Sequence, residues 1–137
     1  MTFLCDTNII SELARPQPNP GVIQWSMGVT TLAISAITLE EITYGLRAKP
    51  NARIQAWLQG FLERSCHILP ITPEIGHYAG LLRGSLRSKG MTRTQADMLI
   101  SATAHIHQLT LVTRNIRDFE DCAVMLLNPF TTTDQAD

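Results

Sequence analysis

The sequence predicts an α/β protein: a three-layer α/β/α sandwich whose central, mainly parallel sheet has four or five strands. Two observations support this fold class. Short apolar runs rich in strand-forming residues alternate along the chain with stretches of helical periodicity. The runs are apolar at consecutive positions, which is typical of parallel strands that helices cover on both faces.

Five runs have the length of a strand. Four of them are uninterrupted: TFLC at 2–5, TLAIS at 31–35, TLVT at 110–113 and AVMLL at 123–127. The fifth, CHILPI at 66–71, contains Pro70, which has no backbone N–H to donate to a neighbouring strand. We therefore expect this run to form a short strand or one at the edge of the sheet.

Helical patterns fill the stretches between these strands. Apolar residues recur at three- and four-residue spacing in NIISELARP, ITLEEITYGLRAK, ARIQAWLQGFLERS and TQADMLISATAHIHQ. A further helix, PEIGHYAGLLRGSLRSKG, begins with a proline suited to a first turn and stops at Gly90. The segment ARPQPNPG is expected to be a proline-rich connection.

The length and charge of the chain limit its organisation. A chain of 137 residues with 45% hydrophobic content can bury one core, so we expect one domain at 1–130 and a flexible tail at 131–137. The formal net charge is −1, with 11 Lys and Arg against 12 Asp and Glu. Because this balance provides no bulk positive field, local arginines or bound cations would have to hold an anionic substrate.

The cysteines and the hydropathy of the chain indicate its compartment. Cys5, Cys66 and Cys122 are odd in number and widely spaced, which fits neither a disulfide framework nor a zinc site. No apolar run approaches the roughly 18 residues that span a bilayer. We therefore expect a soluble, cytoplasmic protein without a membrane partner.

Acidic residues stand where strands end or helices begin. Asp6 follows the first strand, Glu41 follows the second, and Asp118 comes after the strand TLVT. Asp97 lies near the start of a helix that could reach the same edge. Because ligands of parallel sheets bind outside the carboxyl ends of the strands, these four side chains are expected to share one acidic pocket.

An all-oxygen cluster of this kind indicates a particular chemistry. Carboxylates without His or Cys partners select hard cations, Mg²⁺ or Mn²⁺, over zinc. Such ions stabilise the attacking and leaving oxygens of a phosphodiester and activate water. The predicted reaction class is phosphoryl transfer to water.

Helix capping is the alternative for each acid, and it is the simpler one when the acids are taken singly. The capping interpretations are an N-cap at Asp6, a T-x-x-E box at Thr38 and Glu41, its aspartate version at Thr94 and Asp97, and an N-cap with a first-turn acid at Asn115 and Asp118. Four independent caps would not need to meet at one edge of the sheet. Their shared position favours a common role.

Taken together, these motifs resemble PIN-domain ribonucleases, and specifically the VapC/FitB group of toxins from type II toxin-antitoxin pairs. The resemblance runs through CDTNIISEL, ISAITLEEITYGL, GMTRTQADMLISATAHIHQLTLVTRNIRDFED and LLNPF, which is nearly the whole chain. It implies a PIN-like fold and a Mg²⁺- or Mn²⁺-dependent endoribonuclease acting on RNA. It also implies a cognate antitoxin, a homodimer and a higher toxin-antitoxin assembly.

The resemblance assigns the metal-binding and catalytic acids to four positions: Asp6, Glu41, Asp97 and Asp118. Glu41 is chosen over its neighbour Glu40 because the family pattern places the acid four residues before a glycine, here Gly45.

Polar and basic residues near the acids complete the expected site. The resemblance places four polar side chains where they could hold the carboxylates or metal waters, with capping as an equal alternative: Thr7, Asn8, Thr113 and Asn115. Arg93, Arg114 and Arg117 are expected to contact RNA phosphate. In-line attack by water would leave 5′-phosphate and 3′-hydroxyl ends.

Two other classes of function share features with this pattern. One is a non-catalytic, PIN-like partner-binding or regulatory domain, in which the acids cap helices and the apolar helices NPGVIQWSMG and ARIQAWLQGFLERS mediate association. The other is a phosphatase of the haloacid dehalogenase type, which needs a second aspartate two residues after the first. Position 8 is Asn8, which argues against the phosphatase.

Overall fold

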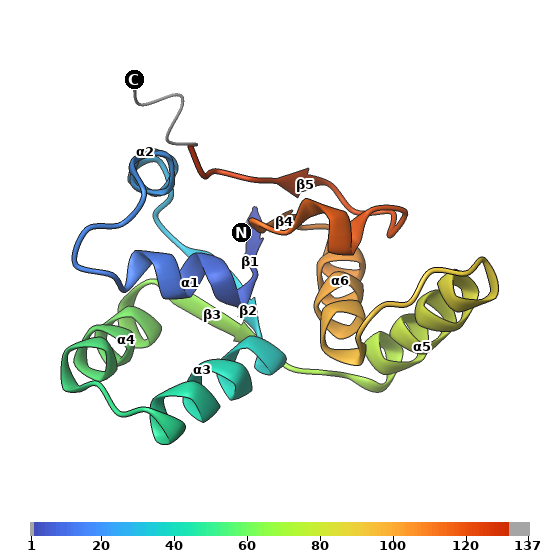
Figure 1. The fold of residues 1–137 in the computed structure, drawn as a ribbon, viewed down its shortest axis with the longest axis horizontal. Helices are drawn as coiled ribbons and strands as arrows, with labels where there is room; N and C mark the ends of the chain where they lie inside the picture. Colours follow the sequence, from blue (N-terminus) through green and yellow to red (C-terminus); the bar gives the residue numbers. More distant parts are fainter. Residues whose placement is uncertain (1, 132–137) are drawn as a thin grey trace.

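Five parallel strands form the central sheet of the computed structural model, which describes residues 2–131 (Figure 1). Their order across the sheet is β3-β2-β1-β4-β5, and every neighbouring pair is parallel. The strands are β1 Phe3–Cys5, β2 Leu32–Ser35, β3 Cys66–Leu69, β4 Thr110–Val112 and β5 Leu126–Leu127. The predicted α/β fold with a mainly parallel sheet of four or five strands is confirmed.

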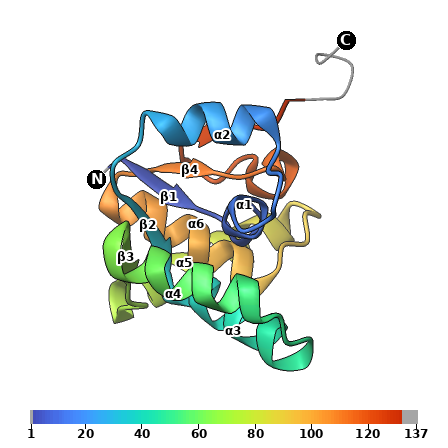
Figure 2. The same cartoon turned by 90° about the vertical axis from the view of Figure 1, so that its left-hand side faces the viewer.

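Six α-helices and one short 3₁₀-helix connect these strands. They are α1 Thr7–Leu13, α2 Pro20–Met27, α3 Ala36–Ala48, α4 Ala52–Arg64, α5 Pro73–Ser88, α6 Gln95–His107 and the 3₁₀-helix η1 Ile116–Phe119. Helices α1 and α4 lie on the opposite side of the sheet from α5 and α6 (Figure 1). In Figure 2, α1 is seen along its axis, with α2 above it and α3 and α4 below it.

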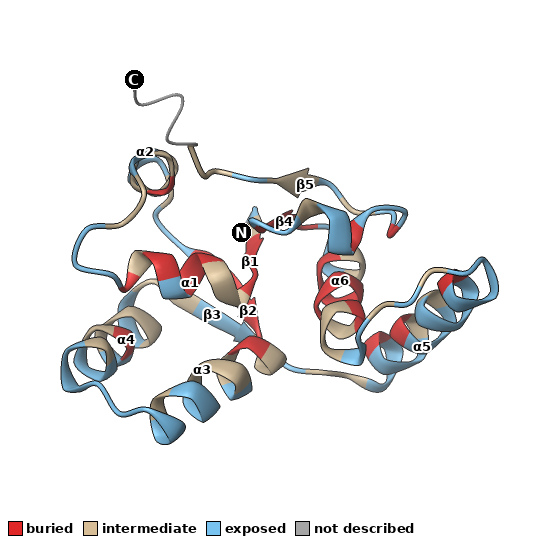
Figure 3. Cartoon of the chain, viewed as in Figure 1, coloured by how far each residue is buried: buried red, intermediate tan, exposed pale blue. Residues whose placement is uncertain are grey.

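Consecutive strand residues point to opposite faces of the sheet, so the core has two halves. Leu4 and its register partner Leu111 pack with α5 and α6, whereas Cys5 and Val112 pack with α1 and α4. All four residues are fully buried. Figure 3 shows β1 and much of α6 in the red of buried residues. Burial on both faces explains why the strands are apolar at consecutive positions.

One predicted helix cap is wrong. Helix α3 begins at Ala36, where the Ser35 side chain at the end of β2 accepts a hydrogen bond of 3.0 Å from the Ile37 N–H. The T-x-x-E box at Thr38 and Glu41 therefore does not form, because Thr38 already lies inside the helix. The strand passes into the helix without an intervening loop, which brings Glu41 close to the end of β2.

The two edge strands of the sheet, β3 and β5, agree only partly with the predicted runs. Strand β3 is an edge strand, as expected, and it ends one residue before Pro70. Strand β5 is shorter than the predicted run at 123–127, because Ala123 has a φ of 54° and cannot pair in a ladder.

The carboxyl end of the described chain is attached to the rest of the fold. Thr131 exchanges hydrogen bonds with Asn19, and the remaining residues of the predicted tail, 132–137, lie outside the described part. No helix between residues 2 and 131 is long and apolar enough to cross a membrane. The three cysteines are free thiols.

Candidate active site

The four predicted acids line one polar pocket at the carboxyl end of the sheet. This pocket, here called the acidic pocket, has a volume of about 500 Å³. The acids that line it are Asp6 after β1, Glu41 on α3, Asp97 in the first turn of α6 and Asp118 in η1. The expected convergence at one edge of the sheet is therefore present.

Asp6 is both a helix cap and the most strongly held carboxylate of the pocket. It is only 6% exposed, and its Oδ1 accepts a 2.8 Å hydrogen bond from the Thr7 N–H. Its Oδ2 accepts from the Thr113 hydroxyl at 2.9 Å and from Asn8 Nδ2 at 3.2 Å. Burial raises the pKa of Asp6, and the nearby Glu41 charge adds to this, while the three hydrogen bonds oppose it.

Glu41 is tied to α1 through Thr7. The Thr7 hydroxyl donates a 2.6 Å hydrogen bond to Glu41 Oε1 and lies 3.3 Å from the Thr38 hydroxyl. Glu41 lines the acidic pocket, whereas Glu40 lies on another surface of α3 that carries Tyr44. Of the two adjacent glutamates, only Glu41 is therefore placed to act with the other acids.

Asp97 shows how strongly the acids affect one another. Thr94 caps α6 by accepting a 3.1 Å hydrogen bond from the Asp97 N–H, which confirms that part of the capping prediction. Burial raises the pKa of Asp97 to about 6, and the charges of Asp6, Asp118 and Glu41 also raise it. Carboxylates that raise one another's pKa share a site that favours a cation.

No basic side chain neutralises these four acids. Between residues 2 and 131, the one ion pair joins Arg15 to Glu12, at 3.2 Å, and it involves none of the four. The four acids therefore have no ion-pair partner in the described part of the chain. Arg15 and Arg114 also line the pocket, and Arg15 is paired with Glu12.

The donor atoms suit a hard divalent cation. The pocket supplies carboxylate oxygens without His or Cys, which is the ligand set of Mg²⁺ or Mn²⁺. Within the described part of the chain, no three such ligands are already gathered at metal-binding distance. Mg²⁺ does not need that arrangement, because it usually takes one or two carboxylates and keeps several waters. The residues present therefore fit such an ion.

Asn8 and Thr113 join the end of β1 to the end of β4. Asn8 Oδ1 accepts from the Arg114 N–H at 3.0 Å, and its Nδ2 also lies 3.4 Å from the Thr113 hydroxyl. Thr113 is fully buried and accepts a 3.0 Å hydrogen bond from the Asn115 N–H. Asn115 occupies the N-cap position of η1 and Asp118 lies in its first turn, as the capping interpretation predicts, but the Asn115 side chain makes no capping bond.

The three candidate RNA-binding arginines are placed differently. Arg114 lines the acidic pocket, and its guanidinium carbon lies 4.8 Å from the centre of the Phe130 ring. Arg93 is half-buried and Arg117 is exposed on η1, and neither lines the pocket. Phosphate contact by these two residues stays a prediction.

Four further residues line the pocket without having been assigned to it from the sequence: Ser11, Glu12, Arg15 and Phe130. Glu12 is only 6% exposed, and its Oε2 accepts a 2.7 Å hydrogen bond from the Asn19 N–H. The polar positions 8, 11 and 12 share one face of α1 by their spacing, and Arg15 follows the helix three residues after Glu12. This polar spacing was the signal in the sequence that could have found them.

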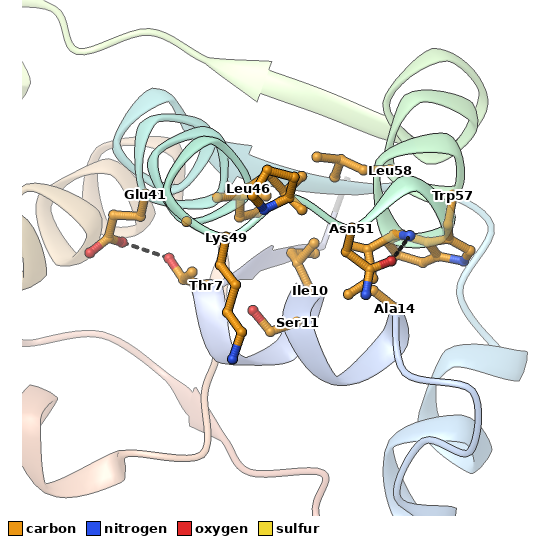
Figure 4. Close-up of a pocket in the computed structure, with 14 residues that line it drawn as sticks. Thr7, Ile10, Ser11, Ala14, Glu41, Leu46, Lys49, Asn51, Trp57 and Leu58 are labelled. Carbon is orange, nitrogen blue, oxygen red and sulfur yellow. Dashed lines mark hydrogen bonds between the residues drawn. The ribbon is translucent and has the colours of Figure 1, made fainter.

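A second pocket lies beside the acidic one, between α1, α3 and α4. This apolar pocket has a volume of about 440 Å³, and its lining includes Ile10, Ala14, Leu46, Trp57 and Leu58. Figure 4 shows the Thr7–Glu41 hydrogen bond at one end of it and Trp57 at the other. Thr7, Ser11 and Glu41 line both pockets, so the two are adjacent.

Comparison with known protein families shows to which family the chain belongs. The PIN domain matches residues 3–124, which is most of the sequence. The chain belongs to the PIN-domain family. The predicted resemblance to VapC/FitB toxins is also confirmed, because several curated PIN-domain relatives carry these names.

These relatives match over nearly their whole length. The chain is 34% identical to Toxin FitB of Neisseria gonorrhoeae over 136 residues, covering 93% of this chain and 98% of the relative. It is 31% identical to VapC ribonuclease Y4jK of Sinorhizobium fredii, covering 93% and 97%.

Solved structures show the same fold. The FitAcB structure from Neisseria gonorrhoeae matches with a TM-score of 0.80 and 33% identity, covering 93% of this chain and 98% of that one. VapBC2 from Rickettsia felis, bound to a DNA fragment from its promoter, matches with a TM-score of 0.82 and 30% identity, covering 96% and 100%. The PIN-domain fold therefore extends over almost the whole chain.

Proposed function

We propose that this PIN-domain chain is a Mg²⁺- or Mn²⁺-dependent endoribonuclease and the toxin of a toxin-antitoxin pair. The observation that carries the proposal is the acidic pocket, where four carboxylates converge and none of the four makes an ion pair in the described part of the chain. Relatives named ribonuclease and tRNA(fMet)-specific endonuclease support RNA as the substrate.

Four residues would hold the ion: Asp6, Glu41, Asp97 and Asp118. When bound, a divalent cation stabilises charge on the attacked phosphodiester and activates water for hydrolysis. The protein's own contribution is to fix these carboxylates. Thr113 and Asn8 orient Asp6, and Thr7 orients Glu41, so the ligands are positioned before the substrate arrives.

Arg114 is the basic residue placed to hold the substrate. It lines the acidic pocket, and its backbone N–H is fixed by Asn8. Its guanidinium can take two phosphate oxygens at once, which positions the backbone of the RNA. Attack by water in line with the leaving oxygen would leave 5′-phosphate and 3′-hydroxyl ends.

The apolar pocket is the proposed contact for the antitoxin. FitAcB and VapBC2 are complexes of related chains, which supports a protein partner here. The pocket is lined by Leu46, Trp57 and Leu58 and reaches the acidic pocket at Glu41. A partner segment that folds on binding could therefore fill the apolar pocket and reach the acids with a basic side chain.

Location and assembly follow from the same proposal. A toxin acting on RNA works in the cytoplasm, and the three free thiols are compatible with that reducing compartment. We expect a homodimer that joins its antitoxin in a larger assembly. Light scattering of the purified chain, alone and with the antitoxin, would measure both states.

The test of the catalytic proposal is Asp6→Asn. The variant keeps the shape of the side chain but removes its charge, so RNA cleavage in Mg²⁺ should fall by about 100-fold or more. The control is Glu40→Gln, which removes an acid outside the acidic pocket and should cleave like the wild type.

Two results would contradict this proposal. Full Mg²⁺-dependent cleavage by Asp6→Asn, with a folded circular-dichroism spectrum, would remove Asp6 from the site. Wild-type protein that neither cleaves RNA nor binds Mn²⁺ at millimolar concentration would favour the non-catalytic partner-binding domain.

A further inference from the structure

We infer that Phe130 is a base-stacking residue of the active site and that, beside Arg114, it positions a nucleotide flanking the cleaved phosphodiester. The inference rests on the proposed RNA cleavage and adds a residue to it. The sequence indicated no role for Phe130, which lies 12 residues beyond Asp118, the last of the four acids.

Phe130 stands at the acidic pocket rather than wholly inside the core. One part of the ring packs against the core half that contains Val112, and the residue remains half-buried. The ring also lines the acidic pocket together with Asp6, Asp97 and Arg114. The Arg114 guanidinium lies over the ring at this pocket, so a base of the substrate can stack on the ring when the guanidinium turns from the ring to a phosphate.

Arg114 and Phe130 form one unit at this pocket. The Arg114 guanidinium carbon lies 4.8 Å from the centre of the ring, within the range of a cation–π contact. A guanidinium binds phosphate and an aromatic ring stacks on a base, so together they match the two parts of a nucleotide.

The segment that carries Phe130 is fixed at both sides of the ring. On one side, Asn128 Oδ1 accepts a 3.0 Å hydrogen bond from the Phe130 N–H. On the other, Asn19 Nδ2 donates to the Thr131 carbonyl at 2.9 Å, and Asn19 Oδ1 accepts from the Thr131 N–H at 3.0 Å. Figure 1 shows this chain running from β5 across to α2.

Glu12 and Gly21 extend that support into α1 and α2. The buried Glu12 carboxylate accepts from the Asn19 N–H and so holds the residue that anchors Thr131. Gly21 lets the segment approach α2 closely, because a Cβ there would lie 2.2 Å from the Pro129 carbonyl oxygen. The position of the ring is therefore built by several contacts across the fold.

Single-stranded RNA is the ligand that these features fit. Proteins recognise unpaired RNA by stacking its bases on aromatic side chains while cations hold the backbone. A paired helix would keep its bases stacked on each other and away from the ring. The stacked base belongs to a nucleotide beside the cleaved bond, because the ring and the four acids share one pocket.

The test uses a fluorescent 12-nucleotide single-stranded RNA whose cleavage site has been mapped with the wild-type protein. Phe130→Leu keeps an apolar side chain but removes the ring, so KM should rise about 10-fold with kcat nearly unchanged. Phe130→Trp should restore the wild-type KM. Tyr44→Leu is the matched control, because Tyr44 is an exposed aromatic residue outside the acidic pocket.

The same RNA with an abasic nucleotide on either side of the cleaved bond identifies the stacked base. With the wild type, KM should rise about 10-fold when the abasic nucleotide is at one of the two positions. With Phe130→Leu, the abasic nucleotide at that position should raise KM no further. The inference would be overturned if the abasic nucleotide raised the KM of Phe130→Leu as much as that of the wild type. An unchanged KM in Phe130→Leu with the intact RNA would also overturn it.

Gly21→Ala tests whether the position of the Phe130 ring matters, because it leaves the Phe130 side chain itself unchanged. The added methyl displaces the 129–131 segment and should raise KM as Phe130→Leu does. Gly80→Ala is the control, because a Cβ at Gly80 meets nothing within 4 Å. A wild-type KM in folded Gly21→Ala would count against the inference. Absence of any wild-type cleavage would instead overturn the proposed function, and the inference with it.

Discussion

The acidic pocket and the apolar pocket lie side by side and share Thr7, Ser11 and Glu41, but they are built in different ways. The acids of the first come from the start of α1, from α3, from the first turn of α6 and from η1. Backbone and hydroxyl groups hold Asp6 there, and the Thr7 hydroxyl holds Glu41. The second is lined by the sides of α1, α3 and α4, where Leu46 and Trp57 are half-buried and Ile10 and Leu58 are buried.

This difference separates two tasks on neighbouring surfaces. Charged groups with fixed hydrogen bonds suit a cation and an RNA phosphate, whereas half-covered apolar side chains suit a protein partner. Glu41 is common to both, and its Oε1 accepts from Thr7 where the pockets meet. A partner seated in the apolar pocket would therefore lie next to a carboxylate that is proposed to hold the ion.

The largest effect that would separate the pockets is expected from Leu46→Glu. A charge in the apolar pocket should weaken binding of the antitoxin by about 100-fold while RNA cleavage stays within a few-fold of the wild type. Isothermal titration with the antitoxin and a cleavage assay measure the two properties. Leu46→Met, which keeps the apolar lining, is the control.

The opposite result would contradict the separation of tasks between the two pockets. If Leu46→Glu folds and binds the antitoxin normally but no longer cleaves RNA, the apolar pocket serves catalysis and the two surfaces have one task.

The parts of the molecule that the sequence predicted depend on local patterns. Strands β1, β2 and β4 were visible as apolar runs, and Asp6 was recognised because it directly follows a strand. Chain order and strand direction then place Asp6, Glu41 and Asp118 at the same edge. These features need only near neighbours and the geometry of a parallel sheet.

The parts that the sequence did not predict include a contact between distant residues. Asn19 and Thr131 are 112 positions apart, and their hydrogen bonds bring Phe130 to the acidic pocket. The capping box at Thr38 was wrong because Ser35, at the end of β2, starts the helix earlier. The Asn19–Thr131 contact has no local signature. The Ser35 cap is local, but Ser35 also ends the apolar run TLAIS and was assigned to the strand alone.

A smaller effect, confined to the acidic pocket, is expected from Thr113→Val. The substitution keeps the volume of this fully buried side chain but removes the hydroxyl that donates to Asp6 at 2.9 Å. Loss of that bond should weaken Mn²⁺ binding about 10-fold and lower the free energy of unfolding by about 1–3 kcal/mol.

Calorimetric titration of Mn²⁺ and chemical denaturation measure these two losses. Thr43→Val, at an exposed position of α3, is the control and should change neither. Unchanged metal affinity in Thr113→Val would show that Asp6 is held well enough by Thr7 and Asn8 alone.

The smallest effect is the pH dependence of stability in metal-free protein. The pKa of Asp97 is raised to about 6 by burial and by the neighbouring acids, above its ordinary value of 3.8. Between these two pH values the folded chain holds a proton that the unfolded chain releases, so stability falls as pH rises and stays lower above pH 6. Asp97→Asn removes this contribution and should raise the Tm by a few degrees at pH 7 in EDTA, but not at pH 4.

Thermal unfolding of Asp97→Asn at the two pH values measures this difference, with Asp121→Asn, an exposed aspartate outside the acidic pocket, as the control. Mg²⁺ should raise the Tm of the wild type at pH 7 more than that of Asp97→Asn, because the ion offsets a repulsion that the variant lacks. Equal effects of Mg²⁺ on both proteins would mean that Asp97 does not face the ion. The acidic pocket would then depend on Asp6, Glu41 and Asp118 alone.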